Sequence, residues 1–568
     1  METPAQPRLG LPYSARVLVV DNEEEYRQLY RILLEHWGYK PFVATGEGQA
    51  LLENAVHTAQ ANRCQLALVD MRLLDNNDSD DLSGLELIPR LKPTQSIVVS
   101  AFGNHRSATI SIKQKGAVSF VGKEEGADRL QEELTQAAAR YCVGCRQLDI
   151  LPADLGQQVN QRLFPGRDDV AEDEPAELLG RLFPEARRLS LERLDDPERQ
   201  PSSRVPRPRS MVLLARPDDF QPVVVKLARA HKVKKEIDRY REYIENRLYG
   251  NFSPPLKNWD MLWAVGGMVY PFIGATSVET FTRYYAAASP SAIERGLEKF
   301  FKRTWSSLYA APRGERRPNI FEAYCAVWDR DWFDQRLTKC PFILPPQGTS
   351  AQWQHLQVPN PLAWLSERLR YPADLPQTAL AITHGDLHGD NMLVDDNGNI
   401  WVIDFERSGP GPVLQDFVEL ETDIITRLVN LPEEDFGSFY TLCWLVSQPT
   451  RLGEHDFPAS IRHPQLSKAA QVIAALRRLA RECTGEFDSY PYLWSMLLNV
   501  LFRISLLDAE AQQRSYQRAV MFGSILCHRL EHWGETWPPA EWPIPSLERQ
   551  SSCSNTAHNT PYLTGKMS

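Results

Sequence analysis

The stretch "AITHGDLHGDNMLVDDNGNIWVIDFE" (residues 381–406) sets acidic side chains beside apolar runs that are typical of buried strands. Asn397 and Gly398 form the strongest short signal for a two-residue hairpin loop. With these two residues as the loop, Asn391 lies opposite Asp404 on the paired strands. Opposed side chains point to the same face of a hairpin. The sequence therefore predicts an amide oxygen beside a carboxylate, a pair of donors that suits Mg²⁺.

Asp386 lies on the segment that leads into this hairpin. Its carboxylate is free there to orient or deprotonate a hydroxyl nucleophile, which is the work of a general base. The spacing H-x-D-x-x-x-x-N, followed by an apolar strand and Asp-Phe, is the pattern of the catalytic and metal loops of kinase-type phosphoryl-transfer enzymes. The pattern predicts Asp386 as the catalytic residue and Asn391 and Asp404 as metal ligands.

"THGDLHGDNML" followed by "VIDFE" resembles the aminoglycoside and choline phosphotransferases, and more closely the phosphotransferase-like ternary-complex-associated domains of bacterial signalling proteins. The resemblance covers about residues 206–430, with looser support to 545. It implies an α+β, protein-kinase-like fold of two lobes, an N-lobe at about 206–275 and a helical C-lobe at about 276–545. It also implies ATP and Mg²⁺ as cofactors and a hydroxyl group as the acceptor.

The same resemblance implies roles for residues outside the hairpin. Lys226, an isolated amine within "VVVKL", matches the phosphate-binding lysine, and Glu236 in the charged helix that follows matches its partner. "GMVYPFIGA" (267–275) matches the strand that contacts adenine. Asp416 in "GPGPVLQDF" matches a position that braces the catalytic loop.

The chain also departs from the kinase pattern. No glycine occurs from 181 to 249, although a phosphate cradle normally needs glycine so that backbone amides can approach the ligand. Glu406 stands where the Asp-Phe-Gly motif has glycine, and Glu242 and Glu245 rival Glu236 as partners of the lysine. The alternatives to an active enzyme are a catalytically quiet binding module and a small-molecule hydroxyl kinase with an inert receiver.

The first 146 residues alternate short β-branched runs with an amphipathic helical pattern. The runs are "RVLVVD" (16–21), "LALVDM" (66–71), "SIVVSA" (96–101) and "VSFVGK" (118–123). Buried strands that alternate with helices predict a doubly wound parallel α/β sheet. Ligands of such sheets gather beyond the carboxyl ends of the strands. These ends carry two acids, a hydroxyl and an amine, namely Asp21, Asp70, Ser100 and Lys123.

This set suits a phosphorylated aspartate. Asp21 would help to hold a divalent ion, Asp70 would attack a phosphoryl group, and the hydroxyl and the amine would bind the phosphoryl oxygens. Residues 14–140 resemble a response-regulator receiver domain of two-component signalling, with a five-stranded sheet and bounds of about 12–146. The resemblance implies Asp70 as the phosphoacceptor and a sensor histidine kinase as the phosphodonor.

The receiver resemblance assigns further residues and shows departures. It implies Asn22 as the second metal-binding position beside Asp21, with Ser100, Phe120 and Lys123 as the switch residues. An amide at position 22 weakens magnesium binding unless Glu23 compensates, and "LLDNNDSDDLSG" after the phosphoacceptor is unusually long and acidic. Glu124 stands where proline is usual. A receiver-like module that no longer accepts phosphate is therefore the alternative.

The rest of the chain is less informative. Residues 147–205, acidic and rich in proline, are expected to be a linker with one short helix at 176–189. After residue 420 the patterns are mostly helical, and 546–568 is expected to be a disordered tail. Long helical patterns occupy 467–483, 492–508 and 515–534.

The totals limit the class of protein. The chain has 568 residues, enough for several domains, and a formal net charge of −10, which argues against non-specific binding of nucleic acid. No apolar run is long enough to span a bilayer, so no membrane partner is expected. Nine cysteines, an odd and scattered set, suggest reduced thiols in the cytoplasm. We expect a cytoplasmic response regulator whose receiver controls a kinase-like output domain with an unknown acceptor or protein partner.

Overall fold

The computed structural model describes residues 15–535, apart from gaps of which the longest are 102–110, 195–209 and 329–349. The chain forms two compact units, and the expected tail lies outside the described residues. The first unit comprises Met1–Arg193, Pro208–Lys234 and Leu256–Phe272, and the second comprises the remaining segments. Within the described part of the chain, no helix is both long and apolar enough to cross a membrane.

The first unit begins with a parallel five-stranded sheet in the order β2-β1-β3-β4-β5, which confirms the fold expected of a receiver. The strands are β1 (Arg16–Val20), β2 (Lys40–Val43), β3 (Leu66–Val69), β4 (Gln95–Ser100) and β5 (Ser119–Gly122). Four of them are the apolar runs of the sequence. The remaining strand, β2, lies at the edge of the sheet and is only partly buried, so it lacks a continuous apolar run.

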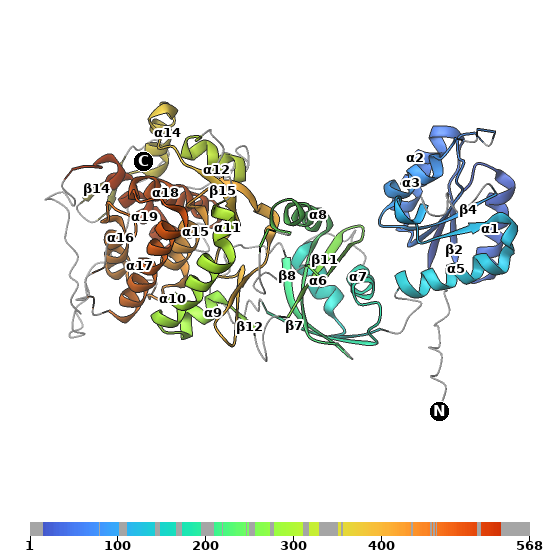
Figure 1. Ribbon diagram of the computed structural model, residues 1–568, viewed down its shortest axis with the longest axis horizontal. Coiled ribbons are helices and arrows are strands. Elements are labelled where there is room, and N and C mark those ends of the chain that lie inside the picture. Colours follow the sequence, from blue (N-terminus) through green and yellow to red (C-terminus); the bar gives the residue numbers. More distant parts are fainter. Residues whose placement is uncertain are drawn as a thin grey trace, which may run out of the picture. The chain divides into compact units, whose positions relative to one another are not determined.

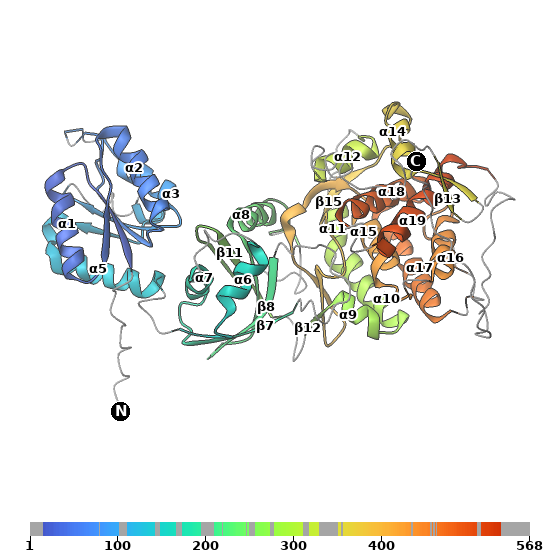
Figure 2. The same cartoon turned by 180° about the vertical axis from the view of Figure 1, so that it is seen from behind.

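Helices cover both faces of this sheet (Figures 1 and 2). Val17 and Val19 of β1 belong to the core cluster under α1 (Glu24–His36) and α5 (Gly126–Tyr141). The alternate residues Leu18 and Val20 belong to the core under the other two helices. These are α2 (Gly48–Ala61) and α3 (Ser83–Leu91). Side chains of a strand alternate between its two faces, so one apolar run supplies both cores.

The interval 147–205 is not a linker, and that expectation was wrong. It forms two strands and two helices. The two strands belong to a second sheet, which has six strands in the order β10-β11-β9-β8-β7-β6. The two strands are β6 (Asp149–Leu151) and β7 (Arg188–Arg193), and the helices are α6 (Leu155–Leu163) and α7 (Glu174–Leu182). Leu189 and Leu191 of β7 are buried while their neighbours are more exposed, which is the alternation of a strand with one face on a core.

The other strands of this sheet come from the chain after residue 209. β8 (Ser210–Pro217) and β9 (Val223–Arg229) are antiparallel neighbours, formed by the apolar runs "MVLLA" and "VVVKLA". The charged helix α8 (Ala230–Arg239) follows directly. The sheet is completed by β10 (Asn258–Met261) and β11 (Val265–Pro271).

Helix α7 also contacts the five-stranded part of the first unit. Arg181 donates from Nε to the carbonyl oxygen of Tyr141 at 3.1 Å and from Nη1 to that of Pro93 at 3.1 Å. Its Nη2 donates to Glu177 at 3.1 Å, and Gln65 Nε2 donates to the same carboxylate at 3.2 Å. One buried arginine–glutamate pair therefore joins α7 to the receiver region.

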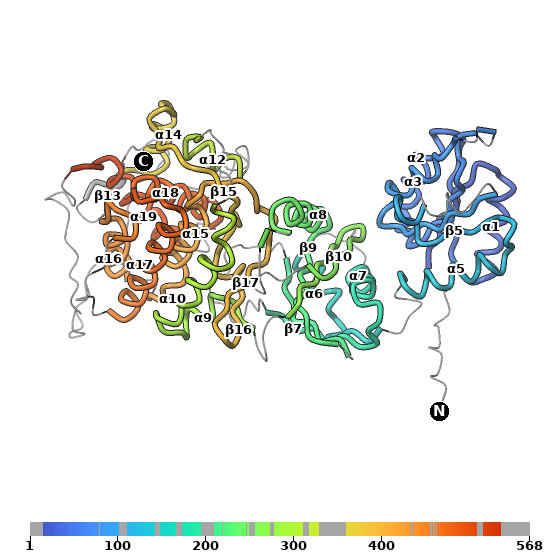
Figure 3. The backbone as a smooth tube through the Cα atoms, in the orientation of Figure 1, coloured from blue at the N-terminus to red at the C-terminus, as the bar shows by residue number. Residues whose placement is uncertain are grey.

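The second unit is mostly helical, and Figure 3 traces its long helices. The three C-terminal helical patterns are confirmed as α17 (Pro464–Thr484), α18 (Ser489–Leu506) and α19 (Gln513–Glu531), with α18 buried nearly all round. The other α-helices are α9 (Phe281–Ala287), α10 (Pro290–Glu298), α11 (Ser306–Tyr309), α12 (Ile320–Trp328), α14 (Pro361–Arg368), α15 (Gln415–Asp423) and α16 (Phe436–Ser447).

Three small antiparallel sheets accompany these helices. Their orders are β12-β16-β17, β13-β14 and β15-β18. The strands are β12 (Val278–Thr280), β13 (Ser350–Trp353), β14 (Leu356–Pro359), β15 (Leu380–Thr383), β16 (Met392–Asp395), β17 (Ile400–Val402) and β18 (Gly409–Pro412). A sheet followed by a mainly helical region agrees with the expected α+β order, while the assignment of two kinase-like lobes stays a prediction.

Candidate functional site

Three of the predicted receiver residues meet at the carboxyl ends of the parallel strands. Asp21 directly follows β1, Asp70 follows β3, and Lys123 follows β5. Lys123 Nζ lies 2.8 Å from Asp21 Oδ2 and 3.3 Å from Asp70 Oδ1. It also lies 3.6 Å from the ring centroid of Tyr26 on α1, a contact that the sequence alone did not indicate. Parallel strands end at the same edge of a sheet, which is why residues so far apart in sequence converge here.

Burial controls the electrostatics of this cluster. It raises the pKa of Asp70 to about 6 against the opposing effect of Lys123, and it raises the pKa of Asp21 in the same way. The two carboxylates in turn keep the pKa of Lys123 above its usual value despite burial. One ammonium thus faces two buried carboxylates, and a divalent cation would balance the excess negative charge.

The donor chemistry fits Mg²⁺. This ion commonly takes one or two carboxylates and completes its shell with water and phosphate oxygens. The cluster supplies Asp21 and Asp70, and Asn22 is the next residue along the chain. Across the described residues, no group of three or more His, Cys, Asp or Glu side chains is arranged to hold a metal ion.

The switch residues lie beside this cluster on the neighbouring strands. Ser100 is fully buried at the end of β4, where it pairs with Gly122 of β5, the residue before Lys123. Phe120 lies on β5 and is partly buried against the side chains of α3 and β4. The positions agree with the strand-end argument, and their roles in signalling stay predictions.

The hairpin of the second unit differs from the prediction by one residue. β16 and β17 pair with Met392 opposite Val402 and Leu393 opposite Trp401, so the loop has three residues, 396–398, rather than two. Gly398 has φ +70°, the left-handed conformation that a three-residue hairpin loop requires at its end. The ladder therefore sets Asn391 opposite Ile403, whose N–H donates to the Asn391 carbonyl at 3.0 Å.

This shift means that the expected pairing of Asn391 with Asp404 was wrong. A one-residue slip would send a side chain to the other face of a regular hairpin. Asp404 is not in regular strand conformation, however, because its φ of +74° is left-handed and unusual for a residue other than glycine. The local backbone, rather than the strand register, thus decides where this carboxylate points.

Asp386 and Asn391 contact each other directly, which the sequence alone did not indicate. Asn391 Nδ2 donates to the main-chain oxygen of Asp386 at 2.9 Å, which leaves the amide oxygen of Asn391 as the group available to a cation. The Asp386 carboxylate lies 3.4 Å from Arg407 Nη1. Burial lowers the pKa of Arg407, but the charges of four acids, Asp386, Glu419, Glu406 and Asp404, outweigh it and keep that pKa above its usual value.

The acidic face of α15 holds the segment that carries Asp386. Asp416 accepts the backbone N–H groups of His384 at 2.9 Å and Gly385 at 3.0 Å, which confirms its expected bracing contact. Glu419 accepts the N–H of Leu387 at 3.0 Å, and Asp423 accepts that of Gly389 at 2.8 Å. Sequence reasoning missed the last two acids, although their spacing of three and four residues along the helix from Asp416 was a visible signal.

His384 in the same motif is structural. Its side chain is fully buried, and burial lowers its pKa, so the ring is neutral at neutral pH. Nε2 lies 3.1 Å from the carbonyl oxygen of Ile403, which can only accept a hydrogen bond. The histidine therefore ties the catalytic segment to the strand that ends before Asp404.

Lys226 and Glu236 are both buried, at 3% and 2% exposure. Lys226 lies in the middle of β9, between Met268 of β11 and Val212 of β8 in the ladder. Glu236 accepts the backbone N–H of Phe405 at 3.1 Å, so it touches the residue that follows Asp404. The two side chains belong to separate units, and their pairing stays a prediction.

Two families match parts of this chain. Residues 17–135 match the response regulator receiver domain, and residues 329–503 match ternary complex associated domain 9, a span that includes the whole of 381–406. The chain is 35% identical over 115 residues to the nitrogen assimilation regulatory protein NtrX of Azorhizobium caulinodans. That match covers 20% of this chain and only 24% of the length of NtrX.

Similar solved structures divide in the same way. A response regulator from Thermotoga maritima is 23% identical, with 22% of this chain and 97% of that one covered and a TM-score of 0.18. A thermostable mutant of aminoglycoside phosphotransferase APH(4)-Ia, in a ternary complex with ADP and hygromycin B, is 13% identical. The match covers 60% of this chain and 93% of the phosphotransferase chain, with a TM-score of 0.35. These TM-scores are too low to establish a shared fold.

The two family matches identify the domains of this chain, and the fold of the first five strands agrees with the first match. The chain joins an N-terminal response regulator receiver domain of two-component signalling to a ternary complex associated domain 9.

Proposed function

We propose that this protein is a response regulator in which phosphorylation of Asp70 controls a kinase-like phosphotransferase domain. The proposal rests above all on the geometry of the segment that carries Asp386: buried acids of α15 accept its backbone amides, and the main-chain oxygen of Asp386 accepts a hydrogen bond from Asn391. A receiver implies a phosphodonor such as a histidine kinase, and the acceptor of the second domain is a hydroxyl group of unknown origin.

In the receiver, a carboxylate oxygen of Asp70 attacks the phosphorus of a phosphohistidine. The P–N bond breaks, an acyl phosphate forms, and the histidine leaves with a proton. Mg²⁺ supplies positive charge to the transferring group, held by Asp21 and Asp70 with Asn22 beside them. Lys123 and Ser100 bind phosphoryl oxygens, and Phe120 follows the movement of the serine.

Labelling with acetyl phosphate and Mg²⁺ tests the receiver. The wild-type chain is expected to gain an acid-stable, base-labile phosphate that Asp70→Ala abolishes. Asp78→Ala removes an exposed carboxylate from the loop after β3 and serves as the matched control. Equal labelling of wild type and Asp70→Ala would show that the receiver no longer accepts phosphate.

In the second domain, Asp386 orients or deprotonates the acceptor hydroxyl. The amide oxygen of Asn391 and the carboxylate of Asp404 are donors that suit Mg²⁺, which would supply positive charge to the transferring phosphoryl group. Lys226 lies on the third strand of the antiparallel series β7, β8 and β9, and Glu236 lies on the helix that follows. This order of strand lysine and helix glutamate is the one that kinase-type enzymes use for phosphate binding.

A catalytically quiet binding module is the second candidate. Two observations favour it: Arg407 forms an ion pair with the proposed base at 3.4 Å, and no glycine occurs from 181 to 249. A carboxylate that already faces a guanidinium has fewer oxygen lone pairs open to an acceptor hydroxyl. The module would then bind nucleotide or a partner without turnover.

Incubation of the full chain with radiolabelled ATP and Mg²⁺ separates these candidates. An active domain releases or transfers the γ-phosphate, and Asp386→Ala reduces the rate by about 10²-fold or more. Asp374→Asn, at an exposed site distant in sequence from the hairpin, is the control. Nucleotide binding without turnover in wild type would instead support the quiet module.

A further inference from the structure

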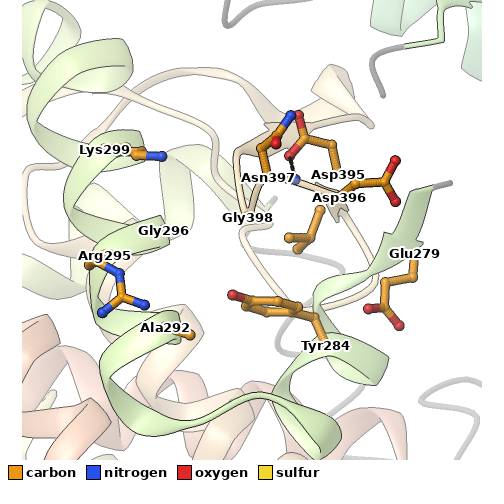
Figure 4. Close-up of a pocket in the computed structure, with 11 residues that line it drawn as sticks. Glu279, Tyr284, Ala292, Arg295, Gly296, Lys299, Asp395, Asp396, Asn397 and Gly398 are labelled. Atoms are coloured by element: carbon orange, nitrogen blue, oxygen red, sulfur yellow. Dashed lines mark hydrogen bonds between the residues drawn. The ribbon is translucent and has the colours of Figure 1, made fainter. Parts of the chain in front are cut away.

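A polar cavity of about 360 Å³ lies at the tip of the β16–β17 hairpin in the second unit (Figure 4). One wall is the α10 helix and the start of the π-helical stretch Lys299–Trp305 that continues it. The facing wall is the hairpin loop, and β12 with the start of α9 completes the cavity. Its volume falls at the low end of the range for small-molecule sites, so it fits a metabolite of the size of an amino acid better than a nucleotide.

Two glycines bring the walls together at one side. A Cβ atom on Gly296 of α10 would lie 3.0 Å from the carbonyl oxygen of Gly398 in the loop. A Cβ atom on Gly398 would lie 3.3 Å from the hydroxyl of Tyr284. The absence of side chains at both positions allows the helix to touch the loop and leaves the tyrosine hydroxyl open to the cavity.

The basic and the acidic side chains of the cavity lie on opposite sides. Arg295 and Lys299 extend from α10 and its continuation on one side, and Glu279 and Asp396 lie on the opposite side, with Tyr284 between them (Figure 4). Lys299 Nζ also lies 3.3 Å from the side-chain oxygen of Asn399. Among the described residues, the side chains of Arg295 and Glu279 make no hydrogen bond or ion pair.

This arrangement discriminates by charge. A simple anion would meet the carboxylate of Glu279, and a simple cation would meet Arg295 and Lys299. A molecule with an acid at one end and an ammonium at the other satisfies both walls. We propose that the cavity binds a small amino acid-type zwitterion, with its acidic end on Arg295 and Lys299, its ammonium on Glu279, and a hydrogen bond to Tyr284.

The proposal is independent of the phosphotransfer proposal. Met392 and Leu393 of β16 separate Asn391 from Val394, where the lining of the cavity begins, and this interval corresponds to roughly 10 Å of extended chain. The ligand would therefore not be the acceptor of Asp386. Because Asn391 directly precedes this strand, occupancy of the loop end would bias the position of the strand that leads to the proposed metal ligand.

Isothermal titration of the full chain tests the site. The probes are the common amino acids and phosphoserine, with N-acetyl-L-glutamate as an anion that lacks the ammonium. At least one zwitterion is expected to bind saturably, and its affinity should fall by at least about tenfold in Arg295→Met and in Glu279→Gln. Arg303→Met removes an exposed cation that lies on the same π-helical stretch but outside the cavity, and it should leave binding unchanged.

Three results would overturn the proposal. The first is no saturable binding of any probe, and the second is equal affinity of glutamate and its N-acetyl derivative. The third is an equal loss in the Arg303→Met control. The comparison of the two glutamate probes needs no variant, so it remains decisive even if a substitution disturbs folding. ATP turnover plays no part in the readout, so failure of the phosphotransfer proposal would be distinguishable.

Discussion

Burial of the charged Asp70 side chain, the proposed phosphoacceptor, lowers the stability of the folded receiver. Its side chain is 4% exposed, and Lys123 offsets only part of the penalty for burying its charge. The pKa is raised from 3.8 to about 6. Because the pKa of this carboxyl group is higher in the folded state, its protonated form favours folding. That contribution to stability is complete below the unfolded-state pKa and is lost as the pH rises through about 6. At neutral pH the folded receiver therefore holds a buried carboxylate that unfolding would return to water.

Asp70→Asn is expected to stabilise the receiver in the absence of Mg²⁺. The gain should be about 2–3 kcal/mol near pH 7.5 and should shrink as the pH falls to about 5, because the carboxyl group becomes protonated in wild type. Hydrogen exchange of receiver peptides in the full chain measures this difference. A variant that is less stable than wild type at about pH 7.5 would show that the Lys123 ion pair outweighs burial.

At Gly398, both the backbone conformation and a neighbouring atom disfavour the addition of a side chain. Gly398→Ala places a side chain at φ +70° and 3.3 Å from the Tyr284 hydroxyl. We expect a loss of about 1 kcal/mol in stability, together with weaker ligand binding in the cavity. Gly485→Ala is the matched control, since its φ is +74° but no atom lies within 4 Å of the added Cβ. Thermal unfolding should place the two variants close together, whereas only Gly398→Ala should affect titration with the zwitterion.

At the scale of an element, α15 shows how one helix organises a loop. Asp416, Glu419 and Asp423 recur at intervals of three and four residues and so lie on one face. They are buried, yet each accepts backbone amides of the segment that carries Asp386. Two cations balance the last acid: Arg427 lies 2.8 Å from Asp423, and Arg503 lies 3.0 Å from it. Such fully partnered charges hold a loop in a single geometry.

Asp423→Ala is expected to destabilise this region by about 3–5 kcal/mol, because it leaves two buried guanidinium groups without a shared carboxylate. The amide of Gly389 loses its acceptor and should exchange much faster with solvent. Hydrogen exchange of the 384–391 segment is the measurement. Glu367→Ala removes an exposed partner of Arg370 and should change stability by less than about 1 kcal/mol. Similar effects of the two variants would contradict the bracing role of α15.

At the scale of the molecule, the contact of the receiver with α7 lies far from the phosphoacceptor. Gln65 and Pro93 precede β3 and β4, at the amino ends of the strands, whereas Asp70 follows the carboxyl end of β3. Any effect of phosphorylation on this contact must pass along the sheet or along α5, which ends at Tyr141. The receiver therefore reaches α7 through its rigid elements rather than through the switch residues.

Arg181→Met tests this contact. The change leaves Glu177 buried without its cation, and burial already raises the pKa of that carboxyl group. We expect a local loss of about 3–5 kcal/mol and faster hydrogen exchange around Pro93 and Tyr141. Exchange near Asp70 should stay as in wild type. Unchanged exchange at both ends of the sheet would show that the arginine does not hold α7 to the receiver.

Features set by short segments of the sequence were predicted, whereas features set by the pairing of distant segments were missed. The strand ends that carry Asp21, Asp70 and Lys123 were found because buried runs and helical periodicity are properties of short segments. β7 was missed because its two buried leucines gain meaning only when the strand pairs with β8 from beyond a long connection. The acids of α15 were visible as a pattern, but only the folded chain shows which amides they accept.

The amino-acid sequence by itself determined the receiver fold, the place of the hairpin and the types of residue available for phosphoryl chemistry, since these follow from composition and from the local period of apolar side chains. Only the tertiary structure decided that the loop has three residues and that Asn391 faces Ile403. It also decided that Asp404 adopts a left-handed backbone and that Arg407 reaches Asp386. These features depend on contacts between distant segments, which can outweigh local preference by a few kcal/mol and shift a strand by a residue.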